Sequence, residues 1–338
     1  MSGWIGLEEH YENPAWNATG DPQNEAARDA RDYFEWVKDR LHSAEKHVED
    51  LDQYGGDYAI VSLTQPGIEG VYDTQAAIDL AKRHNDYVAE TYVRPYPSRL
   101  GAFATVPLQD PEAAAAEAER AVKDLGLLGV NVNGYTNLGD ANTVRYLDEP
   151  PVEVFWAKIA ELGVPVYLHP RDPIPAAQRV FEGYAGLLGS AWGFGVETGT
   201  HVLRILLSGL FDKYPAAKLL TGHLGENVPL MLSRLQRRLN YQVKETQGAH
   251  EQDLIEYYKK NVYVTTAGHF DTHNLLATVM TIGIDRVLFS VDYPYETIED
   301  GAGWWEHVPL NAVDKGRIGR ENAVALFNLP DTIGAPSA

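Results

Sequence analysis

Short apolar runs alternate with longer segments of helical spacing along the whole chain. Each run is bounded by turn residues and is short enough for a single buried strand, and the segment after it repeats its apolar positions as a helix does. The pattern predicts eight strands, each followed by a helix. The predicted strands are residues 4–7, 58–63, 100–106, 128–132, 164–168, 218–221, 262–265 and 287–291.

Repeated strand–helix units predict an α/β fold whose parallel strands are joined by right-handed crossovers. Eight units favour a closed (β/α)8 TIM-like barrel. A doubly wound open sheet is the alternative, but no glycine-rich phosphate turn follows the first strand. No change of composition separates domains, so residues 1–338 are expected to form a single barrel domain. Polar segments at about 11–35 and 170–195 are expected to be long loops over the active site.

Polar residues suited to metal binding stand where several predicted strands end. In a barrel the carboxyl ends of the strands meet at one mouth, so these side chains are expected to converge. Glu8 and His10 are two residues apart, which on an extended strand directs both side chains to one face and Glu9 to the other. The residues at the strand ends are Glu8, His10, Asn133, His169, His223 and Asp292.

Carboxylates and imidazoles on one rim predict a site for a divalent cation. Asp292 taken alone could simply cap the loop that follows its strand. Three histidines together with Glu8 and Asp292 favour the metal site. His201 lies on an apolar helix and is expected to be packed there. The histidines of polar segments are expected to be solvated: His42, His47, His84, His250 and His307.

Composition narrows the classes of function. The 338 residues include 28 Lys and Arg against 48 Asp and Glu, a net charge of −20, which argues against a phosphate-binding surface for nucleic acid. The absence of cysteine excludes disulfides, thiolate nucleophiles, iron–sulfur clusters and Cys-ligated zinc. The first residues lack the basic and apolar parts of a secretion signal, and no apolar run is long enough to span a membrane, so a cytoplasmic location is expected.

Several motifs in order carry a resemblance to a known family. With them, the chain resembles the amidohydrolase-superfamily decarboxylases, and within that group the γ-resorcylate (2,6-dihydroxybenzoate) decarboxylases. The similarity extends over nearly the whole chain, including Val132-Asn133-Gly134 and Ile318-Gly319-Arg320. The principal motifs are Leu7-Glu8-Glu9-His10, Tyr167-Leu168-His169-Pro170, Gly222-His223-Leu224-Gly225-Glu226 and Phe289-Ser290-Val291-Asp292-Tyr293-Pro294.

The resemblance implies a metal-dependent, non-oxidative decarboxylase of an ortho-hydroxybenzoate, giving a phenol and CO₂ in a reaction that is reversible in principle. It implies a homodimer or homotetramer, a small aromatic hydroxy acid as substrate, and no organic cofactor. One Mn²⁺ or Zn²⁺ ion would be held by Glu8, His10, His169 and Asp292.

The chemistry of such a reaction suggests roles for the residues near the ion. Direct loss of CO₂ would leave an aryl carbanion that resonance cannot stabilise, so we expect the ring carbon to be protonated first, with Asp292 as the general acid. His223, oriented by Glu226, would accept the phenolic proton or a hydrogen bond from it. Glu226 could instead stabilise the start of its helix, where a negative charge is favoured.

Three further residues are expected to contact the substrate: Asn133, Trp16 and His269. The family often has Ser-Gly-Asn after the seventh strand, where this chain has Ala267-Gly268-His269. The loop around Trp16 is also particular to this chain. These departures affect the identity of the acid rather than the reaction.

Two other classes of function remain open. A metal-dependent hydrolase of the same superfamily would cleave a lactone, amide or C–C bond. However, such enzymes usually carry His-x-His where this chain has Glu8-x-His10, and Asn133 stands where a bridging lysine would be expected. A non-catalytic barrel that binds a ligand is disfavoured, because a buried cluster of carboxylates and imidazoles is costly without a metal.

Overall fold

The computed structural model describes residues 3–15, 31–330 and 332–334. Within these residues, the strands form a three-stranded sheet in the order β1-β2-β3, a five-stranded sheet in the order β10-β9-β8-β7-β4 and a small hairpin. The two larger sheets are parallel throughout. Their strands are β1 (Trp4–Tyr11), β2 (Gly56–Leu63), β3 (Leu100–Ala102), β4 (Val130–Asn133), β7 (Val166–His169), β8 (Leu219–Thr221), β9 (Val262–Thr265) and β10 (Val287–Leu288).

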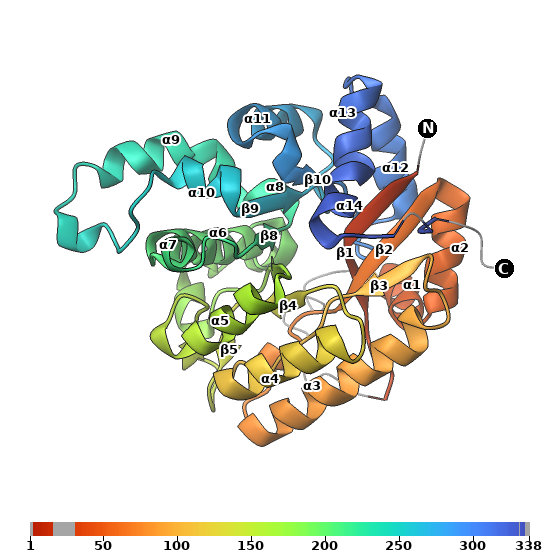
Figure 1. Ribbon diagram of the computed structural model, residues 1–338, viewed down its shortest axis with the longest axis horizontal. Coiled ribbons are helices and arrows are strands. Elements are labelled where there is room, and N and C mark those ends of the chain that lie inside the picture. The colour runs from red at the N-terminus through yellow and green to blue at the C-terminus, as the bar shows by residue number, and fades with distance from the viewer. Residues whose placement is uncertain (1–2, 16–30, 331, 335–338) are drawn as a thin grey trace.

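Two isolated parallel bridges join these sheets at their edges, Ala104 with Val130 and Glu9 with Tyr293. The strands therefore succeed one another in the order of a TIM-like (β/α)8 barrel, with helices around them (Figure 1). This confirms the predicted fold class, although single bridges replace continuous hydrogen-bond ladders at the two seams.

Helices follow the strands, as the alternation predicts, and several of them begin at a capping residue. Asp73, Asp110 and Asp271 each cap a helix by accepting a backbone N–H bond, which satisfies donors that the helix itself leaves unpaired. The helices are α1 (Arg31–Leu41), α2 (Ala44–Tyr54), α3 (Thr74–Val88), α4 (Pro111–Lys123), α5 (Glu153–Leu162), α6 (Gly193–Leu207), α7 (Leu210–Lys213), α8 (His223–Glu226), α9 (Val228–Leu239), α10 (Leu254–Lys260), α11 (Thr272–Ile282), α12 (Ile298–His307), α13 (Ala312–Gly316) and α14 (Asn322–Phe327).

The strand predicted at 287–291 is wrong beyond Leu288. The N–H of Phe289 donates to the Ile318 carbonyl, that of Ser290 to Thr266 Oγ1, and that of Val291 to a Glu9 carboxylate oxygen. Side chains and a distant carbonyl thus replace the partner strand, and the ladder stops early. The sequence analysis also missed α10, α12 and the hairpin of β5 (Thr136–Asn137) and β6 (Val144–Arg145).

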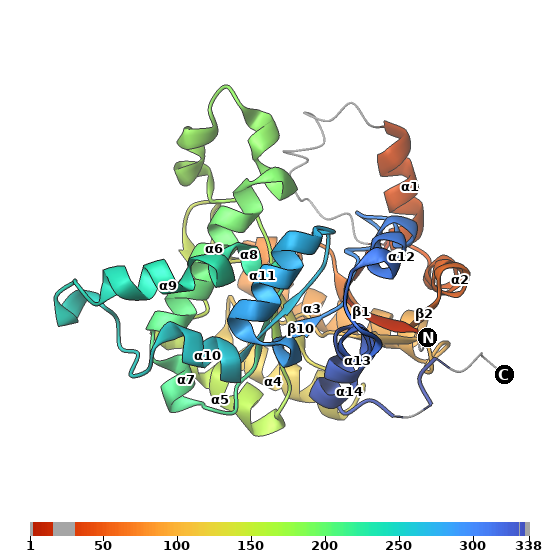
Figure 2. The same ribbon diagram turned by 90° about the horizontal axis from the view of Figure 1, so that it is seen from above.

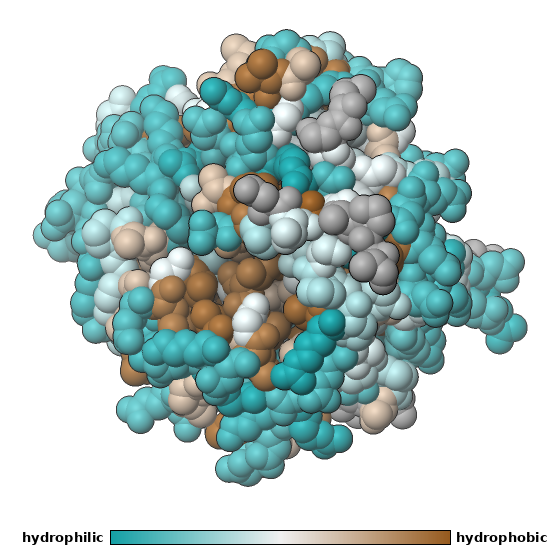
Figure 3. Space-filling view, turned by 45° about the vertical axis from the view of Figure 1, so that its right-hand side comes forward, coloured by the Kyte–Doolittle hydropathy of each residue, from teal (hydrophilic) through white to brown (hydrophobic). Residues whose placement is uncertain are grey.

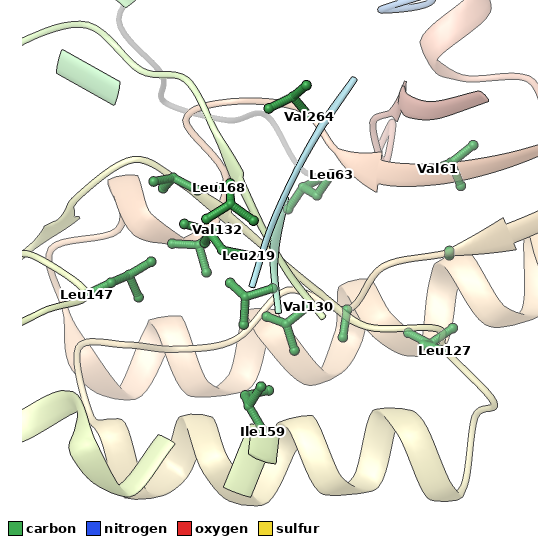
Figure 4. Close-up of a cluster of buried hydrophobic side chains, with 14 of the residues drawn as sticks. Val61, Leu63, Leu127, Val130, Val132, Leu147, Ile159, Leu168, Leu219 and Val264 are labelled. Atoms are coloured by element: carbon green, nitrogen blue, oxygen red, sulfur yellow. The ribbon is translucent and has the colours of Figure 1, made fainter. Parts of the chain in front are cut away.

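The core has two layers. Inside the ring, Ile5, Leu7 and Phe103 pack with residues of the other strands, and Phe327 of α14 packs against this cluster. The outer layer lies between strands and helices, and Figure 4 shows Ile159 of α5 beneath side chains of β4 and β8. This double packing holds the strand ends in fixed positions.

Five of the histidines away from the strand ends were expected to be solvated, and for three of them this is wrong. His47 and His84 are each 1% exposed and His250 is 8% exposed. His47 and His84 lie on faces of α2 and α3 that turn towards the core, and helical position decides their burial more than the polar composition of their segments. His201 is buried, as expected, and its Nε2 accepts the N–H of Leu147.

Two segments project from the ring. Figure 2 shows residues 170–192 rising on the same side of the molecule as α1, and both ribbon views show α9 extending outwards. On the face in Figure 3, hydrophobic side chains line a hollow bordered by hydrophilic ones. Among the described residues, no helix is long and apolar enough to cross a membrane.

Candidate metal centre

A bulge in β1 presents Glu8 and His10 to the interior. Gly6 pairs with Ala59 but Glu9 pairs with Val61, so β1 contains one residue more than β2 over this stretch. Leu7 packs in the inner core, while Glu8 next to it contacts the buried Tyr167 hydroxyl. The extra residue therefore allows two consecutive side chains to reach the inside of the ring, as bulges near active sites often do.

Four side chains from three distant parts of the chain meet at the mouth of the ring. Glu8, His10, His169 and Asp292 each offer one ligand atom, and these atoms lie within 4.8 Å of one another. His10 Nε2 is 3.0 Å from Asp292 Oδ1, and His169 Nε2 is 3.3 Å from Glu8 Oε1. Metal–ligand bonds of about 2.0–2.2 Å place neighbouring ligand atoms about 3 to 3.5 Å apart, so the spacing suits one ion.

A second observation also indicates that these residues suit a divalent cation. Glu8 Oε1 is buried and has no hydrogen-bond partner among the described residues. A buried carboxylate oxygen without a donor is costly unless a cation balances it. Two carboxylates with two imidazoles form a ligand set suited to Mn²⁺ or Zn²⁺.

The cluster is accessible from one side. The side chain of His10 is fully buried and that of Glu8 is 1% exposed, whereas Asp292 is 14% and His223 21% exposed. His223 Nε2 lies 3.7 Å from Asp292 Oδ2 and 3.9 Å from Glu8 Oε1. A small molecule that reaches the cluster therefore meets Asp292 and His223 first.

A left-handed turn positions His223 and Glu226. His223, Leu224, Gly225, Glu226 and Asn227 all have positive φ angles, and the regular helix α9 begins only at Val228. The segment labelled α8 is therefore a left-handed turn, and the helix expected after this strand is α9. Such backbone costs about 1–2 kcal/mol per non-glycine residue, and strain of this kind concentrates at functional sites.

The turn has a clear consequence for the two side chains. His223 Nδ1–H donates to Glu226 Oε1 at 2.7 Å, which leaves Nε2 directed at the carboxylates of the cluster. Glu226 lies outside the regular helix α9, and its hydrogen bond is to His223. The geometry therefore supports the orienting role for Glu226 more directly than a role at the helix start.

Mutual contact shifts the pKa values of the clustered groups. Burial raises the pKa of Glu8 to about 7, and the charge of Asp292 adds to the rise. Burial would also raise the pKa of Asp292, but hydrogen bonds and charges of His10 and His223 outweigh it and hold that pKa below the ordinary value. Burial lowers the pKa of His169 well below its usual range. For His223 burial acts in the same direction, but Glu226 and Glu8 overcome it and raise the pKa well above the usual range.

The sequence analysis missed the residues that hold the cluster from behind. The Tyr167 hydroxyl donates to Glu8 Oε2 and lies 2.9 Å from Thr265 Oγ1. Ser62 Oγ lies 3.3 Å from His10 Nδ1. Tyr167 could have been found, because it is two residues before His169 on one strand and so shares its face.

The close approach of backbone to the cluster requires a glycine at one point. A Cβ at Gly222 would lie 2.1 Å from Glu8 Oε2, a separation that non-bonded atoms do not reach. Only glycine at the end of β8 therefore lets this carboxylate occupy its place.

The three residues expected to contact substrate differ in their positions. Asn133 is fully buried, and its amide donates to the Leu63 carbonyl and to Glu69, which directs it away from solvent. His269 is partly buried, and its Nε2 lies 2.9 Å from the amide of Asn274. Trp16 lies outside the described residues.

Comparison with known proteins places the chain in a family. The family model for amidohydrolases matches residues 11–329. The chain belongs to the amidohydrolase family. Among its relatives is a γ-resorcylate decarboxylase of Rhizobium radiobacter, 38% identical over 97% of this chain and 99% of the relative. The family assignment made from the sequence motifs is thereby confirmed.

Solved structures resemble this chain over almost its whole length. A 2,6-dihydroxybenzoate decarboxylase in complex with 2,6-dihydroxybenzoate has a TM-score of 0.90 at 37% identity and covers 97% of this chain and 100% of its own. A dihydroxybenzoic acid decarboxylase from Polaromonas sp. JS666, with bound manganese and the inhibitor 2-nitroresorcinol, has a TM-score of 0.91 at 37% identity. The match covers 98% of this chain and 99% of the Polaromonas chain.

Proposed function

We propose that this member of the amidohydrolase family is a divalent-metal-dependent decarboxylase that converts an ortho-hydroxybenzoate of the 2,6-dihydroxybenzoate type to a phenol and CO₂. The observation that carries the proposal is the cluster of Glu8, His10, His169 and Asp292 beside the His223–Glu226 pair. The cluster occurs in a chain that is similar, over 97% of its length, to a γ-resorcylate decarboxylase. Over 98% of its length the chain is also similar to a dihydroxybenzoic acid decarboxylase whose structure contains manganese. No organic cofactor is required, because the reaction involves no oxidation.

The metal is assigned to Glu8, His10, His169 and Asp292. When bound, a divalent ion supplies positive charge that neutralises the carboxylate and ortho-oxygen of the substrate. The remaining chemistry belongs to the protein. Asp292 lies on the accessible side of the cluster, within reach of an incoming ring, and is assigned as the acid that protonates the carbon bearing the carboxylate.

Asp292 is ionised within this cluster, because His10 and His223 hold its pKa low. It must therefore receive a proton as the substrate binds, and the ortho-hydroxyl of the substrate carries one. Transfer from that oxygen to Asp292 and then to the ring carbon breaks the aromatic system. The C–C bond then cleaves, CO₂ leaves, and the electron pair restores the ring.

His223 is assigned to the substrate oxygen nearest Asp292. Glu226 fixes its Nδ1–H, so Nε2 is the atom that faces the substrate. Glu226 and Glu8 raise the pKa of His223, which favours the charged imidazolium, and this form can stabilise negative charge on that oxygen. Asn133, His269 and Trp16 are still proposed to lie near the aromatic ring of the substrate. The amide of Asn133 is buried and donates to Leu63 and Glu69, so Asn133 is better placed to support the site than to contact the substrate.

The test is an assay of the purified protein with Mn²⁺ and 2,6-dihydroxybenzoate, in which CO₂ and resorcinol are measured. The isomer 3,5-dihydroxybenzoate serves as the control, because it lacks an ortho-hydroxyl and should release no CO₂. The proposal is refuted if neither 2,6-dihydroxybenzoate nor any other ortho-hydroxybenzoate releases CO₂.

The alternative is a hydrolase of the same family, and the same preparation can test it with lactone and amide substrates. Hydrolysis without any decarboxylation would favour it.

The subunits are proposed to assemble as a homodimer or homotetramer, and residues 1–338 to act as one barrel domain. The cytoplasmic location stays a prediction.

A further inference from the structure

Glu9 lies between two proposed metal ligands but takes no part in the cluster. It is fully buried, and the alternation of side chains along β1 turns its carboxylate away from Glu8 and His10, towards the segment that follows β10. A buried carboxylate in that position needs donors around it. Within the described part of the chain, the hydrogen-bond donors to its carboxylate all come from residues 290–293, on both sides of Asp292.

Both carboxylate oxygens of Glu9 are used. Oε1 accepts the hydroxyl of Ser290 at 3.0 Å and the N–H of Val291 at 3.1 Å, and Oε2 accepts the N–H of Tyr293 at 3.1 Å. The carboxylate therefore binds the backbone directly before and directly after Asp292. It accepts backbone N–H groups that would otherwise donate to carbonyls of a neighbouring strand. It does so at the seam beyond Leu288, where the hydrogen-bond ladder of β10 has already ended.

Asp292 itself has a backbone conformation that needs support. Its φ angle is +77°, in the left-handed region that a non-glycine residue seldom adopts. Conformations of this kind persist only where surrounding contacts impose them. The N–H of Asp292 donates to the Glu8 carbonyl at 2.9 Å, and the N–H groups on either side of it donate to Glu9.

The chain also makes room for this carboxylate. Gly6 lies beside Glu9, and a Cβ added at Gly6 would lie 2.3 Å from Glu9 Oε1. Gly6 does not have a positive φ angle, so its backbone would accept alanine, and the close contact is the only obstacle seen there. The glycine is thus explained by the space that Glu9 occupies.

We propose that Glu9 is a positioning residue, whose carboxylate holds residues 290–293 against β1 so that Asp292 points into the metal cluster. The inference rests on the proposed role of Asp292 as ligand and proton donor. Glu9 does not touch substrate or metal. Its effect on both passes through the backbone of Asp292.

The test is Glu9→Gln, which keeps the size of the side chain but places an NH₂ group against the Tyr293 N–H. Mn²⁺ affinity is measured by titration of metal-free protein, and kcat and KM are measured separately. We expect the Mn²⁺ dissociation constant to rise about 10- to 100-fold, as is usual when a group that supports a ligand is changed. The value of kcat should fall more than KM changes, because proton delivery depends on the orientation of Asp292.

Glu117→Gln is the matched control. Glu117 is a 3% exposed carboxylate in α4 that accepts hydrogen bonds from Asn85 and Arg120, none of them at the cluster. It should lower the thermal unfolding temperature much as Glu9→Gln does but leave Mn²⁺ affinity within twofold. A merely structural role for Glu9 predicts that both variants behave like this control, and that result would overturn the proposal.

Gly6→Ala decides the question if Glu9→Gln does not fold. It displaces the Glu9 carboxylate without changing any charge, and it should also weaken Mn²⁺ binding at least tenfold. Normal Mn²⁺ affinity in folded Gly6→Ala would contradict the proposal. If the unchanged chain binds Mn²⁺ but decarboxylates no substrate, the proposed function is refuted and the role of Glu9 is not. If the unchanged chain binds no Mn²⁺, the proposed function and the role of Glu9 are both overturned.

Discussion

The hydrogen bond from Tyr167 to Glu8 offers a direct test of the metal centre. Tyr167→Phe removes one hydroxyl from a fully buried position and leaves the ring in place. Glu8 Oε2 would then keep, among its present partners, only Thr265 Oγ1 at 3.4 Å. Glu8 would be less firmly held in the orientation that directs its other oxygen, Oε1, at His169.

The size of the effect follows from the kind of bond that is lost. A hydrogen bond to a charged group contributes about 1.5–3 kcal/mol. Since about 1.4 kcal/mol corresponds to a factor of ten, the Mn²⁺ dissociation constant should rise by roughly 10- to 150-fold. This range agrees with the usual cost of removing a group that supports a ligand.

The assay is calorimetric titration of metal-free protein with Mn²⁺, with thermal unfolding as a check that the variant is folded. Tyr92→Phe is the matched control, because the Tyr92 hydroxyl is equally buried and donates at 2.8 Å to the Leu41 carbonyl, away from the cluster. It should lose stability but bind Mn²⁺ normally. If Tyr167→Phe binds Mn²⁺ within twofold of the unchanged chain, Glu8 is not a ligand that Tyr167 supports.

Three other changes test separate parts of the account. Asp292→Asn should abolish turnover while measurable Mn²⁺ remains bound, and a near-normal rate would remove Asp292 as proton donor. His169→Ala should remove both bound metal, measured by elemental analysis, and activity, so that retention of a full metal equivalent would contradict its assignment. Burial lowers the pKa of His201 to about 3. Below pH 6.5, His201 therefore binds a proton in the unfolded chain but stays neutral in the folded chain. The folded state loses stability as the pH falls. Between pH 7.5 and 5.5 this should cost about 1.4 kcal/mol, and His201→Gln should remove that part of the loss in urea unfolding.

The order of strands and helices could be predicted because it depends on local periodicity. Apolar runs such as 58–63 and 262–265 are strands in the structure, at nearly the same bounds. Their hydrophobic pattern is set by burial on both faces, which a short window of sequence contains. The candidate ligands followed from the same reasoning, because parallel strands bring their carboxyl ends to one mouth.

The detailed geometry of the site could not be predicted, because it depends on contacts between segments far apart in the chain. The left-handed turn at His223–Asn227 contains only one glycine, so the local sequence gives no clear signal for positive φ angles there. The bulge in β1 follows from its register against β2, which the sequence of β1 alone does not reveal. Both features determine which atoms of Glu8 and His223 face the cluster.

Asp292 shows where local reasoning stops. Its place after an apolar run suggested a strand end, but its ladder ends at Leu288 and its φ angle is +77°. The proposed support for that conformation comes from Glu9, 283 positions earlier in the chain, which accepts hydrogen bonds from the N–H groups of Val291 and Tyr293. An aspartate has no intrinsic preference for this backbone strong enough to select it. The orientation of the proposed proton donor therefore depends on a carboxylate that neither binds metal nor touches substrate, which is why substitution of Glu9 should affect the site more than its stability cost alone implies.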